Sequence, residues 1–135
     1  MNRLEFLKQI LAAFGGFWLA GNNTVETKPR ENTEPVSLGI MPVAGYRYYD
    51  GKKIENKIRP GDKTLLKREP ENKYDRDAIA IYTLGHKIGY IPRRHNPLIA
   101  LMMDQNANVN ASIAYINEEE EEEGRVWVEV RMGER

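Results

Sequence analysis

The chain has no cysteine, two histidines among its 135 residues, and serine only as Ser37 and Ser112. The absence of cysteine excludes disulfides and thiolate metal sites, although it is compatible with any compartment. His86 and His95 would need carboxylates to complete a zinc site, so we expect no metal. Neither serine lies in a nucleophile motif, so we do not expect a serine hydrolase.

A phosphate-binding loop of the Walker type is also missing. The segment Gly61-Asp62-Lys63-Thr64 has a superficial likeness to it. The motif, however, needs lysine directly after its second glycine and another glycine five residues before that one. Asp62 intervenes here, and Asn56 occupies the place of the first glycine. We therefore expect a protein without catalysis of its own and without a cofactor.

No apolar run in the N-terminal segment, residues 1–21, is long enough to span a bilayer. Its apolar stretch, Ile10 to Ala20, is shorter than the roughly 20 residues required. It has the length of a signal-peptide core, and the preceding residues 3–8 resemble a twin-arginine export signal in which Leu4 replaces the second arginine. We expect residues 1–21 to be a signal-like or anchoring segment and the polar residues 22–35 to be a linker. The protein is then cytoplasmic if the signal does not work, and exported or membrane-tethered if it does.

The formal net charge of zero conceals a division along the chain. Residues 45–94 contain 13 Lys and Arg against 7 Asp and Glu, whereas residues 95–135 contain 3 against 9. The net charges of +6 and −6 indicate one face suited to an anionic partner, unless the charges merely solvate the surface. With 41% hydrophobic and 30% charged residues, the composition is that of a soluble globular domain.

Apolar residues alternate in several short runs separated by turn residues, which predicts a mainly β domain. Asp50-Gly51, Pro60-Gly61 and Leu84-Gly85 are the expected turns, with Gly51 supplying a positive φ. The expected strands cover residues 36–44, 64–68, 78–82, 86–91, 109–117 and 125–132.

One helix is expected over residues 97–105, with Pro97 in its first turn. Leu98, Leu101 and Met102 are spaced to cover the core. The six acids Glu118 to Glu123 are expected at a solvated hairpin tip, away from any surface that binds nucleic acid, because they would repel its backbone.

Three segments combine aromatic, basic and carboxylate side chains. They are Arg47-Tyr48-Tyr49, the loop Asn72-x-Tyr74-Asp75-x-x-Ala78-Ile79, and Gly89-Tyr90-Ile91-Pro92. In this order they resemble the HIRAN domain, which occurs at the N-terminus of some DNA-remodelling helicases and as small free-standing bacterial proteins. The resemblance covers residues 36–132 and is to the free-standing kind. It implies a small six-stranded OB-like barrel with one or two short helices.

The first segment offers tyrosine rings on which bases can stack and a guanidinium that can bind phosphate. The resemblance implies that Arg47, Tyr48 and Tyr49 help to hold a single-stranded DNA end. Because side chains alternate along a strand, we expect one of the two tyrosines to point into the core.

The second segment is the expected centre of the site. Asn72 can fold the loop by an Asx turn, Tyr74 can stack on a terminal base, and Asp75 can accept a hydrogen bond from a 3′-hydroxyl. The resemblance implies recognition of the 3′ end of single-stranded DNA here. Lys73 stands where helicase-linked members usually carry proline, which makes the loop more basic. The alternative for Asp75 is capping and an ion pair with Arg76.

The third segment adds Tyr90 as a stacking face, where helicase-linked members tend to have histidine. Arg93 is an expected phosphate contact close to a helix N-terminus. The leading hypothesis is thus a nucleic-acid-binding module that holds the 3′ end of single-stranded DNA. Its implied partners are that DNA end and a larger DNA-processing protein, with no small-molecule substrate. The alternative is an exported or membrane-tethered β-barrel module for a peptide or another anionic ligand.

Overall fold

Six antiparallel strands dominate the computed structural model, which describes residues 34–133 of the chain. The expectations for residues 1–21 and for most of residues 22–35 lie outside this part. Within it, no helix is long and apolar enough to cross a membrane. The strands are β1 (Val36–Pro42), β2 (Lys63–Arg68), β3 (Ile79–Thr83), β4 (His86–Tyr90), β5 (Val109–Ile116) and β6 (Val126–Met132).

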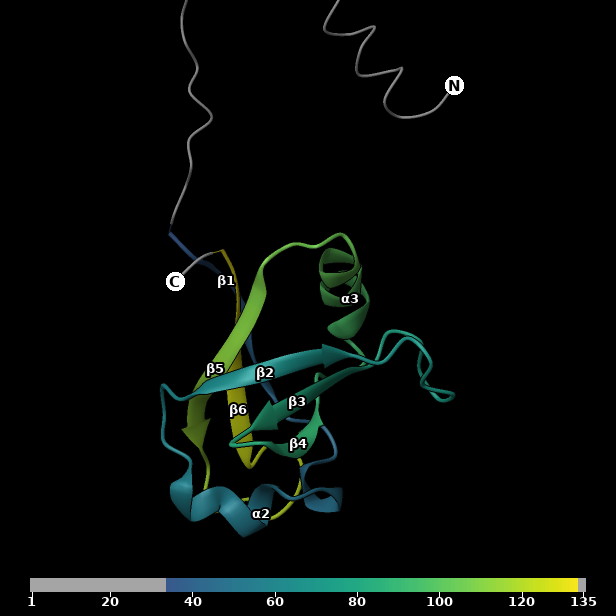
Figure 1. Cartoon of the computed structure of the whole chain (residues 1–135). Coiled ribbons are helices and arrows are strands. Elements are labelled where there is room, and N and C mark those ends of the chain that lie inside the picture. Colours follow the sequence, from purple (N-terminus) through teal and green to yellow (C-terminus); the bar gives the residue numbers. More distant parts are fainter. Residues whose placement is uncertain (1–33, 134–135) are drawn as a thin grey trace, which may run out of the picture. The chain divides into compact units, whose positions relative to one another are not determined.

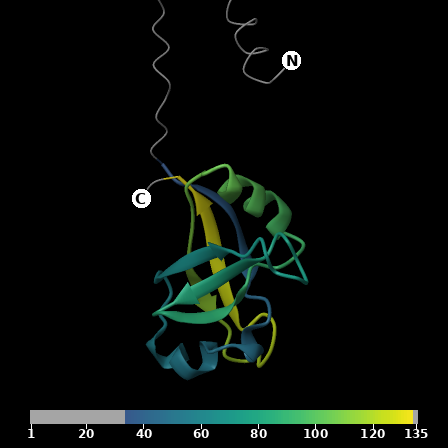
Figure 2. The ribbon, with the colours of Figure 1, turned by 45° about the vertical axis from the view of Figure 1, so that its right-hand side comes forward.

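The strands form one sheet in the order β1-β6-β5-β2-β3-β4, which confirms the mainly β prediction. β2 pairs with β5 only at Lys63 and Thr64 and then continues along β3. It thus crosses from one half of the sheet to the other, as Figures 1 and 2 show. The sheet is not closed into a barrel. Its edge strands β1 and β4 do not pair along their length, and in the described residues a single isolated bridge, between Ala44 after β1 and Tyr90 in β4, connects these two edges.

The short helices lie at the two ends of this sheet (Figure 1). The 3-10 turn η1 (Tyr46–Tyr48), α2 (Gly51–Ile54) and the 3-10 turn η2 (Glu55–Lys57) follow β1, and α3 (Asn96–Asp104) follows β4. The predicted Leu84-Gly85 hairpin turn is confirmed, with φ of 51° and 78° at its two residues, as a two-residue hairpin requires.

Gly51 does not supply the positive φ expected of it, and it begins α2 instead. Its lack of a side chain serves another purpose. A Cβ atom there would lie 2.1 Å from the ring of Tyr46, which is fully buried in the core. Gly51 therefore makes room for the aromatic residue that anchors this end of the domain.

The core consists of branched side chains from both halves of the sheet, chiefly Ile79, Ile81, Ile88, Ile113, Val126, Val128 and Val130. In β1 the alternation of Val36, Leu38 and Ile40 does not mark the buried face. The pairing of β1 with β6 shifts between Ser37 and Gly39, so Met41 is buried while Val36 and Ile40 are exposed. A bulge of this kind moves the following side chains to the opposite face.

The prediction of which face of α3 covers the core was wrong. Leu98 and Leu101 are 65% and 57% exposed, whereas Ile99 and Ala100 are buried. The face of the helix that packs on the core contains Asn96, Ile99 and Ala100, and the side-chain amide of Asn96 is buried. That polar residue fixes the rotation of the helix because its side chain bonds to the loop described below.

Candidate nucleic-acid interface

A pocket of about 400 Å³ lies where three segments distant in sequence meet. They are the turn that follows β1, the loop between β2 and β3, and the chain from the end of β4 to the start of α3. Seven of the nine predicted contact residues line the pocket, and Arg47 and Lys73 do not. The lining consists of Ala44, Gly45, Tyr48, Tyr49, Asn72, Tyr74, Asp75, Ala78, Tyr90, Ile91, Arg93 and Asn96.

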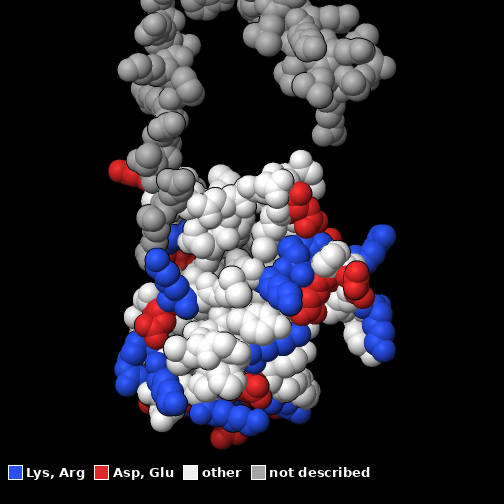
Figure 3. All heavy atoms as spheres, in the orientation of Figure 1, with Lys and Arg blue, Asp and Glu red and all other residues white. Residues whose placement is uncertain are grey.

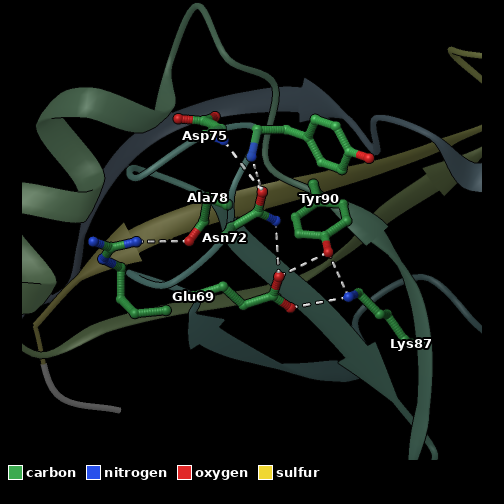
Figure 4. A network of polar contacts seen from close by, with 8 residues as sticks. Glu69, Asn72, Asp75, Ala78, Lys87 and Tyr90 are labelled. Carbon is green, nitrogen blue, oxygen red and sulfur yellow. Dashed lines mark hydrogen bonds and ion pairs between the residues drawn. The ribbon is translucent and has the colours of Figure 1, made fainter.

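The loop between β2 and β3 is shaped by Asn72, as predicted. Its Oδ1 accepts hydrogen bonds from the backbone N–H groups of Tyr74 (2.9 Å) and Asp75 (3.2 Å), which is an Asx turn (Figure 4). Arg68 holds the returning chain by donating from Nη1 to the carbonyl of Ala78 at 2.7 Å. Two side chains thus fix the loop without regular secondary structure.

One wall of the pocket is a network around Tyr90 (Figure 4). The Tyr90 hydroxyl donates to Glu69 Oε1 at 2.8 Å, and Lys87 Nζ donates to Glu69 Oε2 at 2.9 Å and also to that hydroxyl. The Lys87 ammonium lies 4.4 Å from the centre of the Tyr90 ring and 5.1 Å from that of Tyr49. The two rings meet edge to face, with centroids 5.6 Å apart.

The network fixes the charge of each member. Burial acts to raise the pKa of Glu69, but hydrogen bonds from Lys87, Tyr90 and Asn72 outweigh it, and the pKa is lowered. Burial raises the pKa of Tyr90 to about 12, with Glu69 adding to the effect and Lys87 opposing it. Burial opposes the charge of Lys87, yet Tyr90 and Glu69 together raise its pKa. At neutral pH the wall is a neutral phenol beside a compensated ion pair.

The opposite side of the pocket is open. Tyr48 and Tyr74 are 72% and 76% exposed. Arg47 and Lys73, although outside the lining, cover these two rings: Arg47 Cζ lies 4.8 Å from the Tyr48 centroid, and Lys73 Nζ lies 5.3 Å from that of Tyr74. Arg47 and Lys73 therefore each place a charge beside a largely exposed aromatic ring.

The expectation that Tyr48 or Tyr49 points into the core was wrong. Tyr48 is exposed and Tyr49 is 36% exposed, while Tyr46 takes the buried position. The Tyr46 hydroxyl donates to Glu55 Oε1 at 2.8 Å, which satisfies its polar atom. The 3-10 turn η1 breaks the alternation of a strand, so the segment presents two neighbouring tyrosines outward.

Asp75 is held from three directions. Its Oδ1 accepts the backbone N–H of Asp77 at 3.0 Å, and its Oδ2 accepts Asn96 Nδ2 at 2.7 Å. Its ion pair is with Arg93, whose Nε is 3.7 Å away, rather than with Arg76. A carboxylate has about four acceptor positions, so Asp75 can still accept a hydrogen bond from a ligand in the pocket.

Three residues that support the pocket were not singled out from the sequence. Asn96 precedes a proline and is typical of a helix start, and Glu69 and Lys87 are charged residues in or beside strands.

The expected separation of the acidic run from the site was also wrong. Glu122, in the loop between β5 and β6, forms an ion pair with Arg47.

Comparison with known proteins places this geometry in a family. The family model described as HIRAN domain matches residues 38–131. The helicase-like transcription factors of Mus musculus and Oryctolagus cuniculus are 35% and 32% identical to the chain over 77 and 89 residues. These regions are 55% and 63% of this chain but 7% and 8% of those proteins, so the chain spans less than a tenth of their length.

Two solved structures share the fold. A protein from Lactobacillus plantarum is 31% identical, with a TM-score of 0.65 over 73% of this chain and 95% of that chain. The HIRAN domain of human HLTF has a TM-score of 0.58 over 75% and 81%, and at 21% identity it supports the fold alone. With its three motifs gathered around one pocket, the chain belongs to the HIRAN domain family.

Proposed function

We propose that this protein is a nucleic-acid-binding module that holds the 3′ end of single-stranded DNA and has no catalysis of its own. Membership of the HIRAN family supports nucleic-acid binding in general. The observation that carries the finer proposal is Asp75, a carboxylate with spare acceptor capacity inside an aromatic pocket. Such a group favours a ligand that presents a hydroxyl there and disfavours an internal phosphate.

The rest of the pocket supplies what a strand end needs. Tyr48 and Tyr74 offer open rings for stacking, each worth roughly 1–3 kcal/mol per base. Tyr49 and Tyr90 form the fixed wall opposite. Arg93 donates from Nη2 to the carbonyl of Tyr74 at 2.9 Å and keeps further donors for a phosphate.

Arg47 and Lys73 act outside the pocket in this proposal. Each stands over an exposed tyrosine ring, where it would meet the phosphate next to a stacked base. We further infer a larger DNA-processing protein as a partner. The basis is that the matched regions are small parts of much longer helicase-like transcription factors.

The charge states of the wall support binding rather than chemistry. A phenol with a pKa of about 12 stays protonated at neutral pH and supplies no phenolate as a base, and the raised pKa of Lys87 keeps that amine protonated and non-nucleophilic. Asp75 is the remaining carboxylate in the lining, and it is engaged by Asn96 and by the Asp77 backbone.

The test compares three oligonucleotides of one sequence, with a 3′-hydroxyl, a 3′-phosphate or an added 5′-phosphate, in competition binding. A hydrogen bond to a charged group contributes about 1.5–3 kcal/mol, so the 3′-phosphate should weaken binding roughly tenfold or more. The 5′-phosphate should change little. Asp75→Asn should narrow the gap between the two 3′ ends, whereas Glu71→Gln, an exposed charge change in the same loop, should preserve it.

Equal binding of all three oligonucleotides to the wild type would leave a general single-strand binder. Failure to bind any of them, together with binding of acidic peptides, would instead favour the alternative of an exported or tethered module for a peptide or other anionic ligand.

A further inference from the structure

The outer face of β2 carries a repeating pattern that the pocket does not use. Lys63, Leu65 and Lys67 are exposed, and the intervening Thr64 and Leu66 are half-buried. Side chains two residues apart on one face of a strand are roughly 6.6–6.8 Å apart. β2 thus presents a cation, an apolar side chain and a second cation in a straight row.

The strand register connects this row to the pocket. Lys67 is paired with Ala80 on β3, and Ala80 with Tyr90 on β4. Lys67 therefore projects from the same face as Tyr90, two strand spacings away, or about 10 Å. In the next row Leu65 lies opposite Tyr82, whose other neighbour is Lys87.

The charges along this face are available to a ligand. Within residues 34–133 neither Lys63 nor Lys67 forms an ion pair, and the nearby Glu69 is compensated by Lys87. Figure 3 shows this face, with Lys and Arg side chains, interspersed with Asp and Glu, on both sides of an uncharged area over β2, β3 and β4. At the η1 side of the pocket, by contrast, the loop containing Glu118 to Glu123 approaches Arg47 through Glu122.

We propose that the outer face of β2, β3 and β4 is a track for the single strand that continues from the pocket. Lys67 and Lys63 contact its phosphates, and Leu65 and Tyr82 contact its bases. A strand leaving past Arg47 would meet a run of carboxylates, so the opposite direction is favoured electrostatically. The proposal rests on the function proposed above and adds the path and the length of the bound strand.

The test measures binding of a trimer and a decamer of deoxythymidine with free 3′-hydroxyls, by amide NMR titration for the trimer and fluorescence anisotropy for the decamer. In this proposal the trimer occupies the pocket, and the decamer is long enough to reach Lys63 on β2. The double variant Lys63→Gln/Lys67→Gln retains the length of both side chains and removes their charge. The control Lys52→Gln/Lys57→Gln makes the same charge change at exposed positions of α2 and η2.

For single strands each phosphate contact contributes about 0.7 to the slope of log affinity against log salt. Two contacts therefore make the affinity at 0.1 M salt about 25-fold higher than at 1 M salt. The β2 variant should therefore bind the decamer about 25-fold more weakly at 0.1 M salt, with a slope smaller by about 1.4. Its trimer affinity and the decamer affinity of the control should match the wild type.

The outcomes separate the track from the pocket. Unchanged decamer binding by the β2 variant, or an equal loss in the control, would overturn the track and leave the pocket intact. Equal affinity of the wild type for trimer and decamer would do the same. Failure of both oligonucleotides to bind the wild type would overturn the proposed function and the track together.

Discussion

Ala44 and Tyr90 exchange both of their backbone hydrogen bonds. The N–H of Ala44 donates to the carbonyl of Tyr90 at 2.8 Å, and the N–H of Tyr90 donates to the carbonyl of Ala44 at 2.9 Å. Both residues line the pocket, and this pair is also the bridge between the two ends of the sheet. The contact between β4 and the chain that follows β1 and the formation of the pocket therefore depend on the same residue pair.

Gly89→Ala should break this contact. A Cβ atom at Gly89 would lie 2.4 Å from the carbonyl oxygen of Ala44, and φ is 150°. The clash and the backbone strain together should lower the free energy of unfolding by about 2–4 kcal/mol, measured by urea denaturation. Gly85→Ala is the control, because φ there is 78° but no atom lies within 4 Å of a Cβ. A loss at Gly89 no larger than that at Gly85 would contradict the steric explanation.

Tyr74→Ala should weaken binding of single-stranded DNA by roughly 1–3 kcal/mol through loss of one stacking face. The melting temperature should stay unchanged because the side chain is exposed. Fluorescence anisotropy gives the affinity. Tyr115→Ala, at an exposed tyrosine outside the pocket lining, should leave DNA affinity unaltered. Wild-type affinity of a folded Tyr74 variant would remove this residue from the site.

The stability of the domain should fall in acid, in part through Glu69. Its pKa is lowered in the folded state from an unfolded value of about 4.3, so its contribution is present above that value and is lost as the pH falls through the folded pKa. Glu69→Gln should cost about 1.5–3 kcal/mol at pH 7. The difference from the wild type should shrink below pH 4 in urea denaturation. A difference that stays constant from pH 7 to pH 3 would mean that the carboxylate charge does not matter.

The contact between Glu122 and Arg47 predicts a competition between this carboxylate and a phosphate. Glu122→Gln should tighten binding of single-stranded DNA by up to about fivefold at low salt, because an exposed ion pair contributes at most about 1 kcal/mol. The gain should diminish as salt shortens the screening length. Glu119→Gln, in the same loop, should have less effect. Similar gains from both variants would assign the effect to overall charge.

The elements of the fold were predictable where local chemistry decides them. Turn residues such as Leu84-Gly85 and the alternation in β6 determine backbone conformation over a few residues. Which face of an element is buried was less predictable. In β1 an irregularity in pairing changes the register, and in α3 the buried Asn96 fixes the rotation. Both depend on contacts with residues distant in sequence.

The pocket was largely predictable because each of its three segments carries its own aromatic and charged side chains. The residues that hold the pocket wall in place were not predictable. Lys87 and Glu69 are ordinary charged residues in the sequence, and only the pairing of the strands brings them to Tyr90. The ion-pair partner of Arg47 was not predictable either, because Glu122 is 75 residues away in the sequence.

The tyrosines of the pocket differ in how much freedom folding has already removed from them. Tyr49 and Tyr90 are held around the Lys87 ammonium, so a ligand meets a preorganised wall on that side. Tyr48 and Tyr74 are largely exposed, and the cations beside them, Arg47 and Lys73, are exposed as well. Ordering each of these rings on binding costs about 0.5–1.5 kcal/mol. The entropy lost at the open side therefore limits the affinity of the pocket. A change that orders Tyr48 or Tyr74 in the free protein would tighten binding without adding a contact.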